Sequence, residues 1–116
     1  MQRKADDAAI AVYVAPTKAL CSEKYEDWKR RFGTVAEDAF SCFLMTGDSE
    51  TDLSSPDFVR SVRPGSVSVV VSTPEKWDMM TRNWRENDVA RVRDTKLVMI
   101  DEVGVLIYYF CEKKEM

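Results

Sequence analysis

Four short apolar runs, separated by segments with a different period, constrain the fold of this sequence more than any other feature. The runs stand at residues 10–15 (IAVYVA), 40–45 (FSCFLM), 67–72 (VSVVVS) and 97–100 (LVMI). Continuous apolar runs of this length are typical of strands that are buried on both faces of a parallel sheet. Because helical patterns lie between the runs, the sequence predicts an α/β fold with a mainly parallel sheet and right-handed crossovers.

The first helix is predicted between the first two runs, from Thr17 to Phe32. Its apolar residues recur every three or four positions, while charged residues fill the other face; the apolar set is Cys21, Tyr25, Trp28 and Phe32. Thr17 can cap this helix and Gly33 can end it. Residues 49–56 have the composition of a loop, which a further loop or a short helix follows, and Pro64-Gly65 predicts a turn.

The second helix is predicted to begin at Thr73-Pro74-Glu75, with Thr73 as the cap and Pro74 at the first helical position. Trp77, Met80 and Trp84 share one face of this helix. Tryptophans can stack on bases in proteins that bind single strands. The helical spacing of these side chains, and of Trp28 in the first helix, favours packing in the core or between domains instead.

Composition narrows the functional classes. The 116 residues include no histidine and three cysteines without CxxC spacing, so neither a Cys/His zinc site nor a disulfide framework is expected, and buried, reduced thiols are predicted. The first seven residues are too polar for a signal peptide, and no apolar run approaches the roughly 20 residues that span a bilayer, which predicts an intracellular protein without membrane contact. With a net charge of −3 and a pI near 5.0, any nucleic-acid contact must be local.

Polar residues follow each apolar run. They lie in the segments Ala15-Pro16-Thr17-Lys18, Thr46-Gly47-Asp48, Thr73-Pro74-Glu75 and Asp101-Glu102. The carboxyl ends of parallel strands meet at one edge of a sheet, where ligands of α/β proteins bind, so these segments are predicted to converge there. Taken singly, each segment is an ordinary turn or a solvated strand end. Taken together, in this order, they indicate a ligand site.

The same segments resemble the motifs of one enzyme family. APTKAL at 15–20 resembles motif Ia of the superfamily-two DExH-box helicases, LMTGD at 44–48 resembles motif Ib, VVSTPEKWD at 70–78 resembles motif Ic, and LVMIDEV at 97–103 resembles motif II, the Walker B strand. TPEKWD, followed by MTR and a tryptophan at 84, is most similar to the meiotic crossover ATP-dependent DNA helicases of the Ski-type branch. The resemblance covers residues 10–103 and implies a RecA-like domain of the P-loop NTPase class.

The resemblance also implies roles for the polar residues. Asp101 would hold the Mg²⁺ of a bound ATP, and Glu102 would be the catalytic group that orients or deprotonates the attacking water. Two adjacent acids act on one ligand only where a turn aims both inward, because successive strand side chains point to opposite faces. A single-strand track would follow the other pairs, where hydroxyls, backbone amides and a helix N-terminus hold phosphates: Thr17, Lys18, Thr46, Gly47, Thr73 and Pro74. The implied partner is single-stranded or partly duplex nucleic acid, DNA rather than RNA, in the nucleus. The resemblance also implies that intact members couple ATP hydrolysis to 3′-to-5′ strand separation.

Three departures from the family pattern limit what this chain is expected to do alone. The phosphate-binding sequence GxxxxGK[ST] occurs nowhere in it, so weak or no binding of Mg²⁺ and ATP and no useful ATPase are expected. Gly104 stands where DExH members carry histidine. The segment VLIYYFCEKKEM at 105–116 does not resemble the helix that follows motif II. Residues 1–103 are therefore interpreted as a partial helicase ATP-binding domain, and 104–116 as an atypical tail produced by truncation or read-through.

The tail and the function both leave alternatives. VLIYYF has high strand propensity and is an aggregation hazard if it does not pair in the sheet. A non-catalytic fragment that holds single strands or a protein partner is the second functional hypothesis, and binding that does not depend on ATP would distinguish it. A receiver-like phosphoacceptor domain is disfavoured, because that site needs acids at the end of the first strand, where this sequence has APTK.

Overall fold

The computed structural model describes residues 8–32, 40–82, 95–102 and 105–110, with Glu102 and 105–110 described by their backbone alone. The elements are, in chain order, β1 (Ala9–Val14), α1 (Lys18–Phe32), β2 (Phe40–Met45), α2 (Pro56–Ser61), β3 (Val67–Ser72), α3 (Pro74–Arg82), β4 (Thr95–Glu102) and β5 (Val105–Phe110). All four predicted strands and both predicted helices are present. The short helix α2 takes the place where the sequence left a loop or a short helix open.

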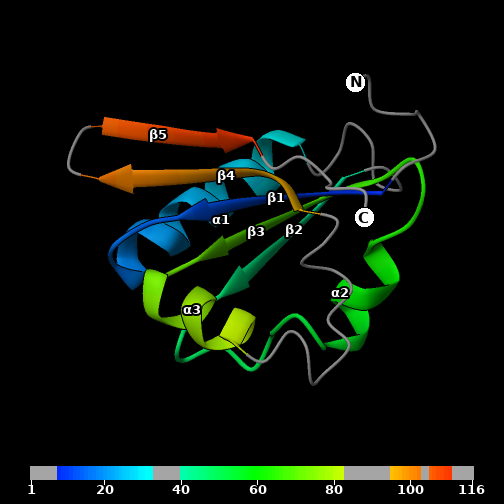
Figure 1. Cartoon of the computed structure of the whole chain (residues 1–116), viewed down its shortest axis with the longest axis horizontal. Coiled ribbons are helices and arrows are strands. Elements are labelled where there is room, and N and C mark those ends of the chain that lie inside the picture. The colour runs from blue at the N-terminus through cyan, green and yellow to red at the C-terminus, as the bar shows by residue number, and fades with distance from the viewer. Residues whose placement is uncertain (1–7, 33–39, 83–94, 103–104, 111–116) are drawn as a thin grey trace.

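The strands form one sheet in the order β2-β3-β1-β4-β5. β1 lies between β3 and β4 and is parallel to both, and β2 is parallel to β3 on its other side (Figure 1). β5 pairs with β4 in the antiparallel direction and forms the edge. This arrangement confirms the α/β fold with a mainly parallel sheet. The VLIYYF segment is β5, and it pairs with β4 along one of its two edges.

Helices cover both faces of the sheet: α1 lies on one face, and α2 and α3 lie on the other (Figure 1). Alternation along β1 explains the two layers, since Val12 and Val14 pack toward α2 and α3 whereas Tyr13 packs toward α1. Val12 and its neighbour Val70 on β3 are fully buried. Each such side chain contributes about 1.5–3 kcal/mol by leaving water.

The apolar face of α1 packs as its spacing predicts. Cys21 is fully buried, and the Trp28 and Tyr13 rings form a T-shaped pair with centroids 5.2 Å apart. Phe32, at the end of the helix, is 46% exposed and packs against the Phe40 ring with centroids 5.5 Å apart. On the opposite face of the sheet, Trp77 of α3 packs on the core. The packing predicted for Trp28 and Trp77 is therefore confirmed, whereas Trp84, Gly33 and Cys111 lie outside the described residues.

Local signals fix the helix starts and one turn. The Leu20 amide donates a 3.2 Å hydrogen bond to the Thr17 hydroxyl, which confirms Thr17 as the cap of α1. Gly65 has a φ of 83°, and a hydrogen bond from the Ser66 amide to the Arg63 carbonyl closes the turn. Glycine suits this position because other residues are strained in the left-handed region. Within the described residues, no helix has the length and apolar character that a membrane span needs.

Candidate nucleic-acid interface

A pocket of about 380 Å³ opens at the carboxyl ends of β1, β2 and β3, beside the first turns of α3. We call it the rim pocket. Its lining comes from the segments that follow these three strands and from α3: Pro16, Lys18, Gly47, Thr73, Glu75, Lys76 and Met79. Lys18, Gly47 and Thr73, which are 55 residues apart from first to last, thus meet at the predicted edge of the sheet.

The other residues predicted for the strand track surround the rim pocket but do not line it. Thr17 is exposed, and its hydroxyl already accepts the cap bond of α1. Thr46 is only 5% exposed, and its carbonyl accepts a 2.9 Å bond from the Ser49 amide. Pro74 is exposed at the start of α3. None of these three residues is therefore among those that line the pocket.

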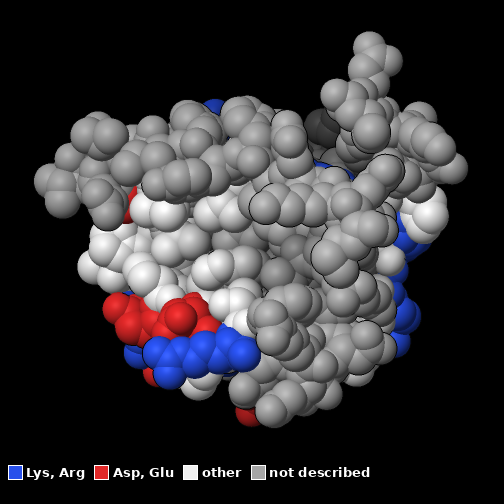
Figure 2. Space-filling view, viewed as in Figure 1, with Lys and Arg blue, Asp and Glu red and all other residues white. Residues whose placement is uncertain are grey.

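The charges at the rim pocket are mixed. The ammonium of Lys18 lies 2.6 Å from a carboxylate oxygen of Asp48, and both side chains are mostly exposed. Glu75 and Lys76 stand side by side at the start of α3. Figure 2 shows acidic and basic side chains next to one another in the region of α3, without a continuous basic surface among the residues described on that face. Any attraction for a polyanion is therefore confined to a few groups.

Gly47 leaves the mouth of the rim pocket open. A Cβ built at this position meets no other atom within 4 Å. Packing inside the protein therefore does not require glycine here, and the space above its backbone is available to a ligand. A glycine in such a position lets a phosphate approach the backbone closely.

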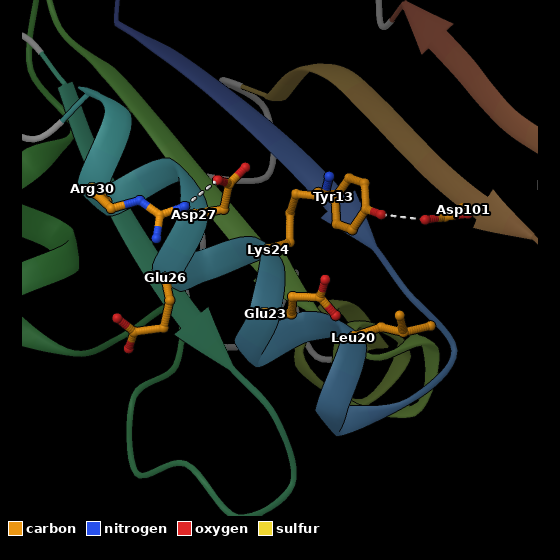
Figure 3. A pocket seen from close by; sticks show the side chains of 8 residues that line it. All are labelled: Tyr13, Leu20, Glu23, Lys24, Glu26, Asp27, Arg30 and Asp101. Atoms are coloured by element: carbon orange, nitrogen blue, oxygen red, sulfur yellow. Dashed lines mark hydrogen bonds and ion pairs between the residues drawn. The ribbon is translucent and has the colours of Figure 1, made fainter.

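Asp101 faces a second pocket, on the α1 side of the sheet. The Tyr13 hydroxyl donates a hydrogen bond to the carboxylate of Asp101 (Figure 3). This pocket of about 370 Å³, which we call the Asp101 pocket, is otherwise lined by α1 residues: Leu20, Glu23, Lys24, Glu26, Asp27 and Arg30. Burial, and secondly the hydrogen bond to Asp101, raise the pKa of Tyr13, so the hydroxyl keeps its proton and remains a donor.

The turn expected at Asp101-Glu102 is not formed, and this part of the prediction is wrong. Both residues belong to β4, where they pair with Leu106 and Val105 of β5. The antiparallel partner strand extends β4 beyond the apolar run, so both acids are strand residues rather than turn residues. Asp101 lines a different pocket from Lys18, and the side chain of Glu102 lies outside the described residues.

The Asp101 pocket does not fit a magnesium nucleotide. Within the described part of the chain, no three acidic, cysteine or histidine side chains are grouped as metal ligands. Among the described lining residues, Glu23, Glu26 and Asp27 face the cations Lys24 and Arg30, and Arg30 is already paired with Asp27 at 2.9 Å. A triphosphate needs amide or cationic donors rather than this acidic surface. The described residues therefore supply one candidate Mg²⁺ ligand, Asp101, and no phosphate cradle.

The sequence predicts Asp48 at this edge of the sheet, but it does not single out Tyr13, Lys76, Met79 or the α1 residues of the Asp101 pocket. Tyr13 reads as one apolar residue of a buried strand. Lys76 and Met79 are three positions apart on α3, the spacing that puts two side chains on one helix face, so this pair carried a usable signal. Asp48 and Lys18 are predicted at the same edge, but their ion pair, which joins residues 30 positions apart, is not predicted.

Known proteins resemble this chain over most of its length. Residues 1–113 match the DEAD/DEAH box helicase family. "Probable ATP-dependent DNA helicase HFM1" of Xenopus tropicalis is 41% identical over 95 residues, which are 82% of this chain and 6% of that protein. "ATP-dependent DNA helicase MER3" of Saccharomyces cerevisiae is 33% identical over 96 residues, 82% of this chain and 7% of that protein. The human "U5 small nuclear ribonucleoprotein 200 kDa helicase" is 32% identical over 97 residues, 82% of this chain and 4% of that protein. The chain thus spans less than a tenth of these relatives.

Proposed function

The chain belongs to the DEAD/DEAH box helicase family, and we propose that it is a segment of an ATP-dependent DNA helicase whose rim pocket holds the backbone of a single strand. The observation that carries the proposal is the meeting of Lys18, Gly47 and Thr73 in one pocket at the carboxyl edge of the sheet. The two relatives named as DNA helicases support DNA as the substrate.

The chemistry of the rim pocket suits phosphate. α3 begins at Pro74 beside it, and the N-terminus of a helix attracts anions through its unpaired amides and its dipole. Lys18 supplies a charge, and the open space at Gly47 admits the backbone of a ligand. None of these groups reads a base edge, which is what a motor that moves along any sequence requires.

The test is binding of a fluorescein-labelled oligo-dT of about 16 nucleotides, followed by fluorescence anisotropy. Lys18→Gln is expected to weaken binding about eightfold at about 50 mM salt and to lower the salt slope by about 0.7, the effect of losing one phosphate contact on a single strand. The matched control is Arg60→Gln. Arg60 is also an exposed cation paired with an exposed aspartate, Asp57, but it lies on α2 at the other end of the sheet (Figure 1).

Gly47→Val is the second variant in this assay. The two branches of valine would fill the open space at Gly47 and are expected to weaken binding without a loss of stability, because nothing inside the protein occupies that space. Equal binding by the Lys18→Gln, Gly47→Val and Arg60→Gln variants would contradict the proposal. The same assay with an oligo-U RNA addresses the substrate, since a preference for oligo-dT is expected. A DNA substrate also makes a nuclear location part of the proposal, which imaging of a tagged protein checks.

The roles of Asp101 and Glu102 remain predictions of the family resemblance. The Asp101 carboxylate already accepts the Tyr13 bond, and three further acids, Glu23, Glu26 and Asp27, line the same pocket. These contacts favour the second candidate, in which this chain binds single strands without turnover. A titration with magnesium ATP is expected to give no saturable binding to this chain and no change on Asp101→Ala. Tight binding that Asp101→Ala abolishes would refute that candidate and support the magnesium role.

A further inference from the structure

Met79 is the large apolar side chain that the fold of α3 does not use. It is 56% exposed, more than Leu20 or Phe32, the other exposed large apolar residues within the described ranges. α3 is anchored by its opposite face, where Trp77 and Met80 pack against the core. Trp77 and Met80 therefore hold α3 in place, and packing of the core does not explain why an apolar residue stands at position 79.

Met79 also belongs to the rim pocket. It shares the face of α3 that carries Glu75 and Lys76, four and three positions earlier, and it lines the pocket together with Lys18 and Gly47. The surface of the pocket is mainly apolar although two lysines contribute to it. This is consistent with lysine stems lying along an apolar wall with their ammonium groups at the edge. A site for phosphate alone does not need such a wall.

We propose that Met79 contacts a base of the single strand whose phosphate is held at Lys18, Gly47 and Thr73. This inference rests on the proposed function and adds a second subsite to it. A nucleotide has a charged group and a flat apolar ring within one residue, and the rim pocket offers cationic and amide groups beside an apolar side chain. The thioether of methionine is flexible and polarizable, and it makes favourable contacts with aromatic rings.

The contact has no base preference. The methionine side chain has no hydrogen-bond donor and only a weak acceptor, whereas every base has a π-face. Stacking therefore adds affinity without reading sequence. Because the contact is uncharged, its contribution to binding does not depend on salt, unlike that of Lys18.

The experiment compares two fluorescein-labelled strands of equal length, oligo-dT and an abasic strand that has the same phosphates without bases. Met79→Gln replaces the side chain with a polar one of nearly equal length. We expect Met79→Gln to weaken binding of oligo-dT about three- to tenfold, somewhat less than the loss of an aromatic platform, and to leave the salt slope unchanged. Binding of the abasic strand is expected to stay the same. Phe32→Gln, an exposed apolar residue far from the rim pocket, is the control.

The outcomes separate this inference from the proposed function. If Met79→Gln weakens both strands equally, or neither strand, while Lys18→Gln still weakens both, the base contact is refuted and the phosphate site stands. If the unaltered chain binds neither strand, both the proposed function and the base contact are refuted. Melting temperatures of the Met79→Gln and Phe32→Gln variants check that folding is intact. Little change is expected for Met79→Gln, because the side chain of Met79 is exposed.

Discussion

Removing the carboxylate of Asp48 is expected to strengthen binding of single-stranded DNA. This carboxylate lies 2.6 Å from the Lys18 ammonium and competes with an incoming phosphate for it. The side chains of Lys18 and Asp48 are 56% and 76% exposed, so their ion pair contributes about 0.2–1 kcal/mol to stability. In the Asp48→Asn variant, binding no longer has to break this ion pair. A saving of up to about 1 kcal/mol in binding free energy corresponds to a gain in affinity of up to about fivefold.

Anisotropy titrations of oligo-dT with the Asp48→Asn variant measure this gain at two salt concentrations. The gain is expected at about 50 mM salt and should shrink at about 200 mM, because exposed charges are screened within about a Debye length. Asp57→Asn is the control, since Asp57 forms the same kind of exposed pair with Arg60 on α2. A weaker or unchanged affinity of Asp48→Asn at low salt would refute the placement of a phosphate at Lys18.

Three further predictions concern the scaffold. Phe58→Ala is expected to cost about 3–5 kcal/mol in urea unfolding, because this ring is fully buried edge-on against Phe43; a cost below about 1 kcal/mol would contradict the packing of α2. Burial raises the pKa of the Cys42 thiol from 9.0 to about 12, so the folded state keeps a proton that the unfolded state loses above pH 9.0. The contribution of the Cys42 thiol to the free energy of unfolding is therefore full below pH 9.0 and is lost as the pH rises toward about 12. Urea midpoints measured across this range should fall less steeply for Cys42→Ala. Tyr13→Phe should cost about 1 kcal/mol by thermal or urea unfolding, since Asp101 loses one donor, and an unchanged stability would show that the bond contributes nothing.

The fold follows from the sequence because local and periodic signals agree. β2 and β3 have the bounds of their apolar runs, and Thr17 caps α1 as predicted. Each of these features depends on residues within a few positions of one another. Parallel strands separated by helices then leave few ways to connect them, so the meeting of Lys18 and Gly47 at one edge follows from topology.

The contents of the two pockets do not follow from such signals. The bond from Tyr13 to Asp101 joins residues 88 positions apart, and it depends on the phase of alternation in two neighbouring strands. β5 extends β4 through Asp101 and removes the expected turn. Pairing between strands decides both features, and it is a property of the register rather than of either segment alone.

The positions of the charged side chains in the structure, rather than the net charge, bear on DNA binding. The whole chain carries a net charge of −3, which opposes binding to DNA at long range. At the rim pocket, however, Lys18, Lys76 and the start of α3 would lie close to the phosphate proposed to bind there, where nearby groups outweigh distant, screened ones. The acids that lower the net charge include Glu23, Glu26 and Asp27, which line the Asp101 pocket instead. Neutralising these acids should therefore affect binding of single strands far less than neutralising Asp48.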